Sequence, residues 1–445
     1  MPYMLNARAS LLLAVTTVFS GCGDGGDRAN AAPATDSTQT AVAAEPAPAP
    51  PTPRESAPDI IRGLYINAYQ AGSDRRLHQL MAIADTTEIN TFVVDVKDER
   101  GIRYNTEIPL AQELADEKEI MLGELSELAD TLQAHDIYSI ARIVLFKDPI
   151  LSKARPDWSV KQPNGELWVD KAGNTWVSPW DKDVWDYNLD IAEEVARAGF
   201  DEIQFDYVRF AEPYASLPPQ IHPEAEGDKT DAIAAFLNEA KRRLHPLGVV
   251  VAADVFGLSP NTPDDVNIGQ QWETIASTAD HILPMMYPSH YLPTHLPGVP
   301  NPNRMPYETI YKSAGMAVLR NDAMREVGVQ PARVIPWLQA FSASWLGDFE
   351  YGPEQLKDQI RGVYAVGLED WILWHPGSQY EPYLSVFEDT LQSHAMEYTP
   401  PADVLAVLER FENQGIHAAR RKAAEQAAGR TTDAAAAEEA KGNKF

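Results

Sequence analysis

The residues best suited to catalysis are carboxylates near the ends of apolar, strand-like runs. Asp98 follows one such run, Asp206 lies in the segment Gln204–Phe210, and Asp254 lies late in a run of valines and alanines. Two carboxyl groups that flank a glycosidic bond can cleave it, one as an acid and the other as a nucleophile or base. We expect Asp206 to be ionised and Asp254, in the more apolar run, to have the raised pKa. Asp98 is a second candidate for the acid.

Other polar and aromatic residues near these run ends are candidates for substrate binding. They are Asp95, Lys97, Arg142, Lys147, Trp176, Gln204, Tyr207, Arg209, Tyr287, Trp337, Gln339 and Trp374. Because side chains alternate along a strand, Asp95 should share a face with Lys97, and Gln204 with Asp206. The alternative for Asp95 is a buried structural ion pair with Lys97 or Arg142.

A long segment, residues 147–181, is rich in tryptophan and is too long to be a plain connection. Five of the ten tryptophans of the chain fall within 28 residues, namely Trp158, Trp168, Trp176, Trp180 and Trp185. Flat aromatic faces suit the apolar faces of sugar rings, although tryptophan also serves to pack a loop onto its domain. We therefore expect some of these rings to form binding subsites for a polysaccharide and two or three to be packing residues.

Eight apolar or β-branched runs must position these residues. They are Arg62–Asn67, Thr91–Val96, Tyr138–Leu145, Glu202–Val208, Val249–Val255, His281–Tyr287, Arg333–Gln339 and Asp370–Trp374. Each is followed by a helix-like stretch, in order Arg75–Asp85, Gly123–Ala134, Lys182–Ala198, Asp231–Leu244, Val266–Ser277, Tyr307–Arg325, Pro353–Ala365 and Tyr383–His394. Eight such units over residues 59–400 predict an α/β protein, a (β/α)8 TIM barrel whose site lies at the carboxyl ends of the strands.

The two ends of the chain differ from the barrel segment in composition. Residues 1–22 combine a short apolar run, Leu11–Phe19, with small residues ahead of the only cysteine, Cys22, as in a bacterial lipoprotein signal peptide. The alternative is an ordinary exported protein with an unmodified cysteine. Residues 23–58 are rich in proline and alanine and predict an extended linker, and residues 401–445 predict an alanine-rich helical or disordered tail. We expect a protein anchored to the bacterial cell envelope through a lipid on Cys22.

Charge and motif content exclude several functional classes. The 445-residue chain has 37 Lys and Arg against 65 Asp and Glu, a formal net charge of −28, which disfavours nucleic acid but not a neutral glycan. The histidines near strands have no paired spacing, so we expect no metal site. There is no glycine-rich phosphate-binding motif, and we expect no cofactor.

Four segments resemble the bacterial "putative glycosyl hydrolase domain" family of (β/α)8 barrels. They are Arg62–Tyr65, Val93–Asp98, Ala141–Pro149 and Gly199–Phe210, and the resemblance covers nearly all of residues 59–390. It implies a glycoside-hydrolase barrel, distantly similar to α-amylases and α-galactosidases, in which the acid that ends the fourth strand is the nucleophile. That acid is Asp206 here, and Asp254 stands where the fifth strand supplies an acid.

One position departs from the pattern of those enzymes. The α-amylase type places a further Asp after the seventh strand, and another large group of barrels ends that strand with a Glu. Here the segment Trp337–Phe341 contains no acid, and Gln339 excludes the second assignment. The chain is thus expected to be a glycoside hydrolase acting on an envelope or extracellular polysaccharide. The alternative is a lipoprotein that keeps the barrel and binds glycans without cleaving them.

Overall fold

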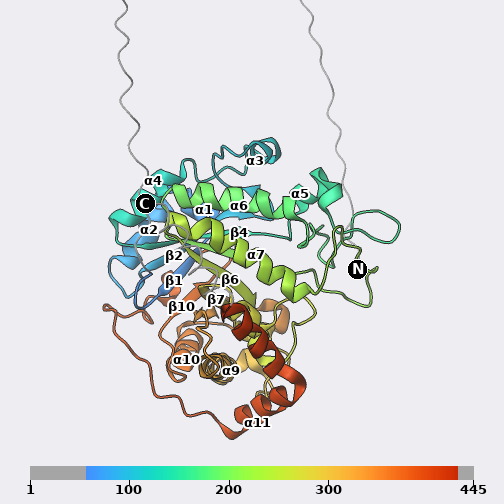
Figure 1. Cartoon of the computed structure of the whole chain (residues 1–445). Coiled ribbons are helices and arrows are strands. Elements are labelled where there is room, and N and C mark those ends of the chain that lie inside the picture. The colour runs from blue at the N-terminus through green and yellow to red at the C-terminus, as the bar shows by residue number, and fades with distance from the viewer. Residues whose placement is uncertain (1–56, 429–445) are drawn as a thin grey trace, which may run out of the picture. The chain divides into compact units, whose positions relative to one another are not determined.

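The computed structural model describes residues 57–428, and these residues form a barrel of parallel strands surrounded by helices (Figure 1). The barrel strands are β1 (Arg62–Ile66), β2 (Thr91–Asp98), β4 (Tyr138–Val144), β5 (Glu202–Asp206), β6 (Val250–Phe256), β7 (His281–Met285), β8 (Arg333–Val334), β9 (Trp337–Gln339) and β10 (Trp371–Trp374). The short strand β3 (Gly101–Ile102) pairs antiparallel with the end of β2.

The sheet closes on itself, as the sequence predicts. Parallel pairing runs from β1 through β2, β4, β5, β6 and β7 to β8 and β9, then to β10, which pairs with β1. The seventh strand is in two pieces, β8 and β9, because Pro336 between them lacks the N–H that a continuous ladder needs. Counting these two pieces as one gives the eight strands of a TIM barrel.

Helices lie between the strands and cover the barrel. They are α1 (Ala68–Ala71), α2 (Asp74–Ala84), α3 (Pro109–Leu114), α4 (Leu125–Ala134), α5 (Pro149–Ala154), α6 (Lys182–Arg197), α7 (Lys229–Leu244), α8 (Trp272–Ala276), α9 (Pro306–Glu326), α10 (Pro353–Tyr364) and α11 (Ala402–Phe411). Figure 1 shows α6 and α7 on one side of the strands and α9 and α10 on another. None of the helices within residues 57–428 has the length and apolarity needed to cross a membrane.

Local sequence explains where these helices begin and end. Asp181 caps α6, since its carboxylate accepts a hydrogen bond from the N–H of Asp183 at 2.9 Å. Gly199, with φ of 103°, ends the same helix, because this conformation suits glycine. Pro306 begins α9, where its missing N–H is not needed.

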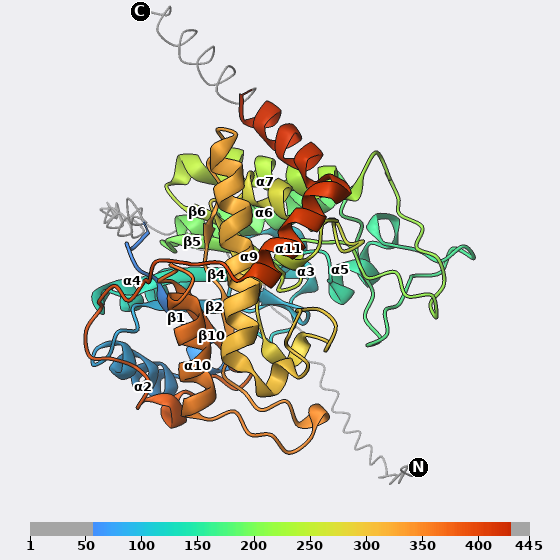
Figure 2. The same cartoon turned by 90° about the horizontal axis from the view of Figure 1, so that it is seen from below.

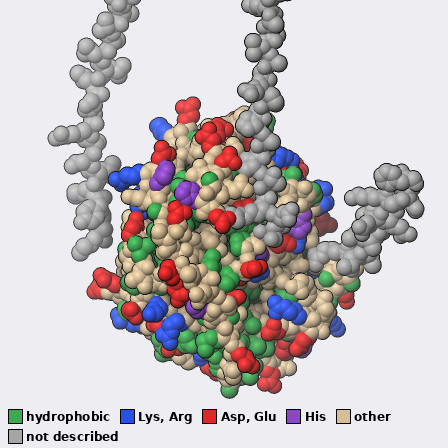
Figure 3. Space-filling view, turned by 90° about the vertical axis from the view of Figure 1, so that its left-hand side faces the viewer, with side chains coloured by type: hydrophobic (Ala, Val, Ile, Leu, Met, Phe, Trp, Pro, Cys, Tyr) green, Lys and Arg blue, Asp and Glu red, His purple; other side chains and the backbone are tan. Residues whose placement is uncertain are grey.

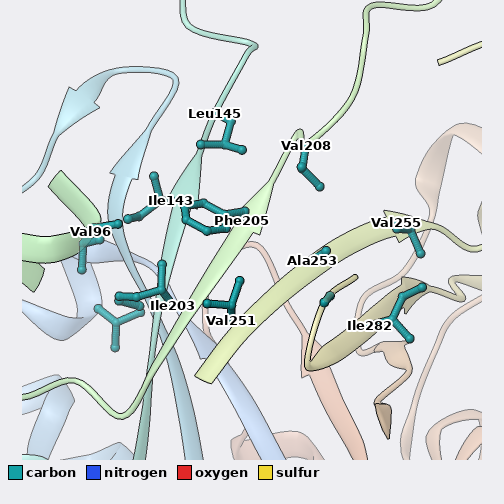
Figure 4. Packing of buried hydrophobic residues seen from close by; sticks show 14 of the residues in the cluster. Val96, Ile143, Leu145, Ile203, Phe205, Val208, Val251, Ala253, Val255 and Ile282 are labelled. Atoms are coloured by element: carbon teal, nitrogen blue, oxygen red, sulfur yellow. The ribbon is translucent and has the colours of Figure 1, made fainter. Parts of the chain in front are cut away.

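The outward faces of the strands and the inward faces of the helices form the main hydrophobic core. Figure 4 shows part of it, with Ile143, Phe205, Val251 and other residues of adjacent strands packed together. The residues that alternate with them face the barrel interior, where a smaller apolar cluster includes Val93, Ile140 and Leu283. Both layers are closely packed, so the barrel is a solid scaffold rather than a pore.

Two predicted helices differ from the structure. The segment Val266–Ser277 is helical only over α8, because Val266 and Asn267 adopt positive φ values of 53° and 62° that no helix contains. The segment Tyr383–His394 is no α-helix: after one 3-10 turn, Glu381–Tyr383, it continues as irregular chain. Its backbone hydrogen-bonds to other elements instead, for example from Glu388 O to the N–H of Glu88.

The end of the described chain is helical. Helix α11 lies beside α9 (Figure 2). The chain then kinks at Gly415, which has a positive φ of 103°, and a further helical stretch reaches residue 428. Acidic and basic side chains are interspersed over the face of the molecule in Figure 3. The predicted signal peptide, with Cys22, and nearly all of the predicted linker lie outside the described residues.

Candidate active site

Asp206 is the last residue of β5 and lies at the carboxyl end of the barrel. The next residue, Tyr207, has φ of 51°, a left-handed conformation that non-glycine residues rarely adopt. The N–H of Tyr207 donates to Oδ1 of Asp206 at 2.6 Å. Strained backbone of this kind is concentrated at functional sites, and here it fixes the direction of the carboxylate.

Arg142, on the neighbouring strand β4, joins two carboxylates. Its Nε and Nη2 donate to Oδ2 of Asp206 at 3.0 and 2.5 Å, and its Nη1 donates to Oδ1 of Asp95 at 2.6 Å. Although burial opposes the charge, the carboxylates of Asp95 and Asp206 raise the pKa of Arg142 well above its usual value. The guanidinium therefore holds Asp206 in an ion pair with fixed geometry.

Asp95 completes this network from β2. The hydroxyl of Tyr65 on β1 also donates to its carboxylate. Burial raises the pKa of Asp95, against the opposing effect of Arg142. The structural ion pair considered from the sequence is thus present, with Arg142 as the partner of Asp95.

Asp254 lies on β6, next to β5, and is 2% exposed. Its Oδ1 accepts a hydrogen bond from Nε1 of Trp337 at 2.7 Å. Burial, together with the negative charge of Asp206, raises the pKa of Asp254 well above its usual value, although Arg142 acts in the opposite direction. Asp254 is therefore pushed toward its protonated form beside Asp206, which is paired with Arg142, and such a difference in surroundings suits an acid paired with a nucleophile or base.

A cavity of about 430 Å3 opens beside Asp206. Its lining includes the predicted residues Tyr207, Arg209 and Tyr287, together with Phe256 and His290, which were not predicted. Its volume falls in the range of small-molecule sites. A larger groove of about 1170 Å3, around Asp280 and Arg333 at the opposite end of the barrel, contains none of the predicted site residues.

Two cations border the site near Tyr207. Nζ of Lys147 donates to the Tyr207 hydroxyl at 3.1 Å and to Glu99 at 3.0 Å. The guanidinium of Arg209 lies 5.0 Å from the ring centre of Tyr207 and pairs with Glu212 at 3.1 Å. Arg209 lines the cavity and can face a ligand there, whereas Lys147 borders the cavity behind Tyr207.

A row of aromatic rings extends from Tyr287, which lines the cavity. Trp374, at the end of β10, lies with its ring centre 6.0 Å from Tyr65, 5.6 Å from Tyr287 and 5.2 Å from Phe341. Phe341 in turn stacks on Trp345 at 6.1 Å. We call Tyr65, Trp374, Tyr287, Phe341 and Trp345 the aromatic wall.

Lys97 does not lie in this site, contrary to the prediction. The pairing of β2 with β4 contains a bulge between Asp95 and Lys97, and this extra residue reverses the alternation of side chains. Lys97 therefore points toward the helices, where its Nζ donates to Val144 O at 2.6 Å and pairs with Asp148 at 2.7 Å. It is fully buried and out of reach of a substrate.

Three other predicted residues are near the site without lining the cavity. Asp98, the last residue of β2, pairs with Arg103 at 3.8 Å. Burial and the negative charge of Asp95 raise the pKa of Asp98. Gln204 is buried in the barrel below Asp206, and its amide has no hydrogen-bond partner in the described chain. Gln339 is buried and accepts a hydrogen bond from the N–H of Ser289, so it supports the segment after β7.

The tryptophan-rich segment after β4 is mainly a packing element, which corrects the expected subsites. Of its four tryptophans, three are buried and Trp180 is partly exposed, and Trp185, in α6, is also buried. Trp176 donates from Nε1 to Asp170 at 3.0 Å, and Trp168 donates to Pro218 O at 2.9 Å. Antiparallel bridges such as Ser159–Val177 fold this segment on itself. Its rings pack against the chain that follows β5: the ring centre of Trp176 lies 5.8 Å from that of Tyr207, and that of Trp180 lies 4.4 Å from that of Phe210.

Tyr65, Phe341, His290 and Trp345 were not predicted from the sequence. Tyr65 could have been found, because it lies on the same inward face of a predicted strand as Gly63, two residues before it. Phe341 and Trp345 come after the seventh strand, where only an acid was sought. The signal for these residues is weak, since it depends on how the loop after β9 folds.

Within residues 57–428, no three or more His, Cys, Asp or Glu side chains gather in a way that could hold a metal ion. The polar groups of the site are carboxylates paired with arginine or tryptophan.

The sequence profile of a family described as "putative glycosyl hydrolase domain" matches residues 63–380. No curated protein matches the chain. The match runs from Gly63 in β1 to beyond β10 and includes both Asp206 and Asp254.

One solved glycoside hydrolase domain shares the fold, and other solved structures are similar over part of the chain. The PgaB (BpsB) glycoside hydrolase domain from Bordetella bronchiseptica is 16% identical, with a TM-score of 0.53, over 75% of this chain and all of that domain. A hypothetical protein from Ruminiclostridium thermocellum is 39% identical over 43% of this chain and 97% of its own, with a TM-score of 0.39. The alpha-galactosidase TtGalA from Thermus thermophilus is 12% identical over 75% of this chain and 61% of its own, with a TM-score of 0.43.

Proposed function

Because the chain belongs to the "putative glycosyl hydrolase domain" family, we propose that it hydrolyses O-glycosidic bonds in an envelope or extracellular polysaccharide. The observation that carries this proposal is the pair of dissimilar carboxyl groups on adjacent strands. Asp206 is paired with a cation, whereas burial and the charge of Asp206 raise the pKa of Asp254. Both lie where TIM-barrel enzymes place their catalytic groups.

The proposed roles follow from these surroundings. Asp254 is protonated and donates its proton to the glycosidic oxygen as the bond to the anomeric carbon breaks. Asp206 attacks that carbon, and water then releases the sugar while Asp254 acts as the base. Arg142 and the N–H of Tyr207 keep the carboxylate of Asp206 oriented throughout. A nucleophilic Asp206 implies retention of the anomeric configuration.

The aromatic wall supports a polymeric substrate. The aromatic wall extends from Tyr65, beside Asp95, to Trp345. Sugar units outside the cavity beside Asp206 could therefore stack on its rings. The acidic protein favours a glycan without a high density of negative charge.

A glycan-binding protein without catalysis is the second candidate. Gln339 favours it, because this residue ends the seventh strand without an acid and is committed to the backbone of Ser289. In that case the same cavity and aromatic wall would bind a glycan without turnover.

The wild-type protein and Asp254→Asn distinguish these candidates. Wild type should release reducing ends from at least one polysaccharide in a panel of bacterial capsular and envelope glycans. Asp254→Asn should lose that activity but still release a burst of about one dinitrophenolate per protein molecule from the matching dinitrophenyl glycoside, because this leaving group needs no proton in the first step. Steady turnover of the dinitrophenyl glycoside should be slow, because the second step lacks its base. Absence of the burst contradicts the role of Asp254, and binding without any product from wild type supports the second candidate.

A further inference from the structure

We infer that Trp345, in the loop 340–352 after β9, forms an outer subsite that binds a neutral sugar ring of the polysaccharide chain. This inference rests on the proposed function and extends it beyond the cavity. Trp345 lies on a 3-10 turn, Ser344–Leu346, and is 63% exposed. It is the most exposed of the large hydrophobic residues in the described chain.

Trp345 lies next to residues that line the cavity beside Asp206. Tyr287 lines the cavity beside Asp206, and its ring centre is 6.0 Å from that of Phe341. His290 also lines this cavity, and its ring centre is 6.1 Å from that of Trp345. A chain that leaves the cavity past these rings therefore meets Trp345 next.

Trp345 is exposed on a loop that is fixed at both ends. The hydroxyl of Tyr383 donates to Ala340 O and to Tyr351 O, both at 3.0 Å. The N–H of Tyr351 donates to Oγ of Ser342 at 3.0 Å, and its hydroxyl donates to Asn303 O at 3.0 Å. The ring is therefore held in place before a ligand binds, which lowers the entropic cost of binding.

The chemistry around Trp345 favours a sugar ring over other ligands. The indole stacks on Phe341 at an interplanar angle of 29°, so the rest of its π surface remains for a flat apolar partner. The C–H groups on one face of a pyranose form such a partner, and aromatic stacking tolerates different sugars. Burial lowers the pKa of His290, so its imidazole is neutral at neutral pH and adds no charge.

Binding of neutral oligosaccharides of increasing length tests this subsite. The probes are cello-, xylo-, malto- and N-acetylchito-oligosaccharides of two to eight units, titrated calorimetrically into the full chain. For the series that binds wild type best, Trp345→Ala should weaken the longest oligomers roughly tenfold and leave the shortest unchanged within about twofold. Trp345→Phe should restore part of the affinity. Leu346→Ala is the matched control, because Leu346 is on the same turn, is 51% exposed and is not aromatic.

Each outcome separates this inference from the proposed function. Equal weakening of short and long oligomers, or none, overturns the subsite even if the protein is an active hydrolase. The expected length dependence in a protein without turnover supports the subsite and contradicts the hydrolase. Absence of binding by every series contradicts the neutral-sugar subsite. Loss of self-association in sedimentation, or of binding to phosphatidylglycerol vesicles, with unchanged oligosaccharide affinity would assign Trp345 to a protein or membrane contact.

Discussion

At the scale of single residues, burial and pairing decide which charged side chains can act on a substrate. Asp206 and Asp254 share the carboxyl end of the barrel, but one has a cation as its partner and the other an indole N–H. Lys97 also lies late in a barrel strand, but its ammonium group forms a buried ion pair with Asp148 and does not reach the site. The sequence alone cannot separate these cases, since each is a charged residue late in a strand.

Lys97→Met should destabilise the protein without changing its activity. The change leaves the buried carboxylate of Asp148 without its cation, which costs about 3–5 kcal/mol. Urea unfolding measures this loss, and Arg197→Met is the control, because its exposed pair with Glu193 contributes less than about 1 kcal/mol. A fall in hydrolysis at a temperature where the variant is fully folded would instead place Lys97 at the substrate.

Asp254→Asn should change how stability depends on pH. The folded state keeps a proton on Asp254 above about pH 4, where the unfolded chain releases it, because the pKa is raised in the fold. Wild-type stability therefore falls as pH rises from about 4 toward that raised pKa, and Asn removes this contribution. The Tm of the variant relative to wild type should increase across this window. A constant difference would show that the pKa of Asp254 is not raised.

At the scale of elements, the barrel was predictable and several details of the site were not. Near-continuous apolar runs such as Thr91–Val96 are typical of parallel strands buried on both faces, and all eight runs are in the barrel. The bulge after Asp95 has no sequence signal of its own, so the face of Lys97 was predicted wrongly. The loop after β9 depends on distant tyrosines such as Tyr383, which periodicity cannot reveal.

The tryptophan-rich segment shows why residue type alone does not identify a sugar site. Trp168→Ala should lower the unfolding free energy by about 3–5 kcal/mol, because the ring is fully buried and donates to Pro218 O. Oligosaccharide affinity at low temperature should not change. Weaker oligosaccharide binding by a fully folded Trp168→Ala variant would show that this segment contacts the glycan.

At the scale of the whole molecule, the barrel is one part of a chain whose first 56 residues lie outside the described structure. The anchor on Cys22 therefore remains a prediction from sequence. Cys22→Ala should move the protein from the membrane fraction to the soluble fraction or leave its signal uncleaved, as seen by fractionation and blotting. Unchanged membrane association of the variant would contradict the lipid anchor.

The central claim is that Asp206 is the nucleophile of a glycoside hydrolase. The most direct test is polysaccharide hydrolysis by wild type and Asp206→Asn, with glycan binding and melting curves measured on the same samples. We predict that the variant binds glycan like wild type and loses turnover by at least about a hundredfold, since the negative charge that stabilises the transition state is gone. Turnover that survives in Asp206→Asn would contradict the assignment. Loss of activity only through a lowered Tm would instead make Asp206 a structural partner of Arg142.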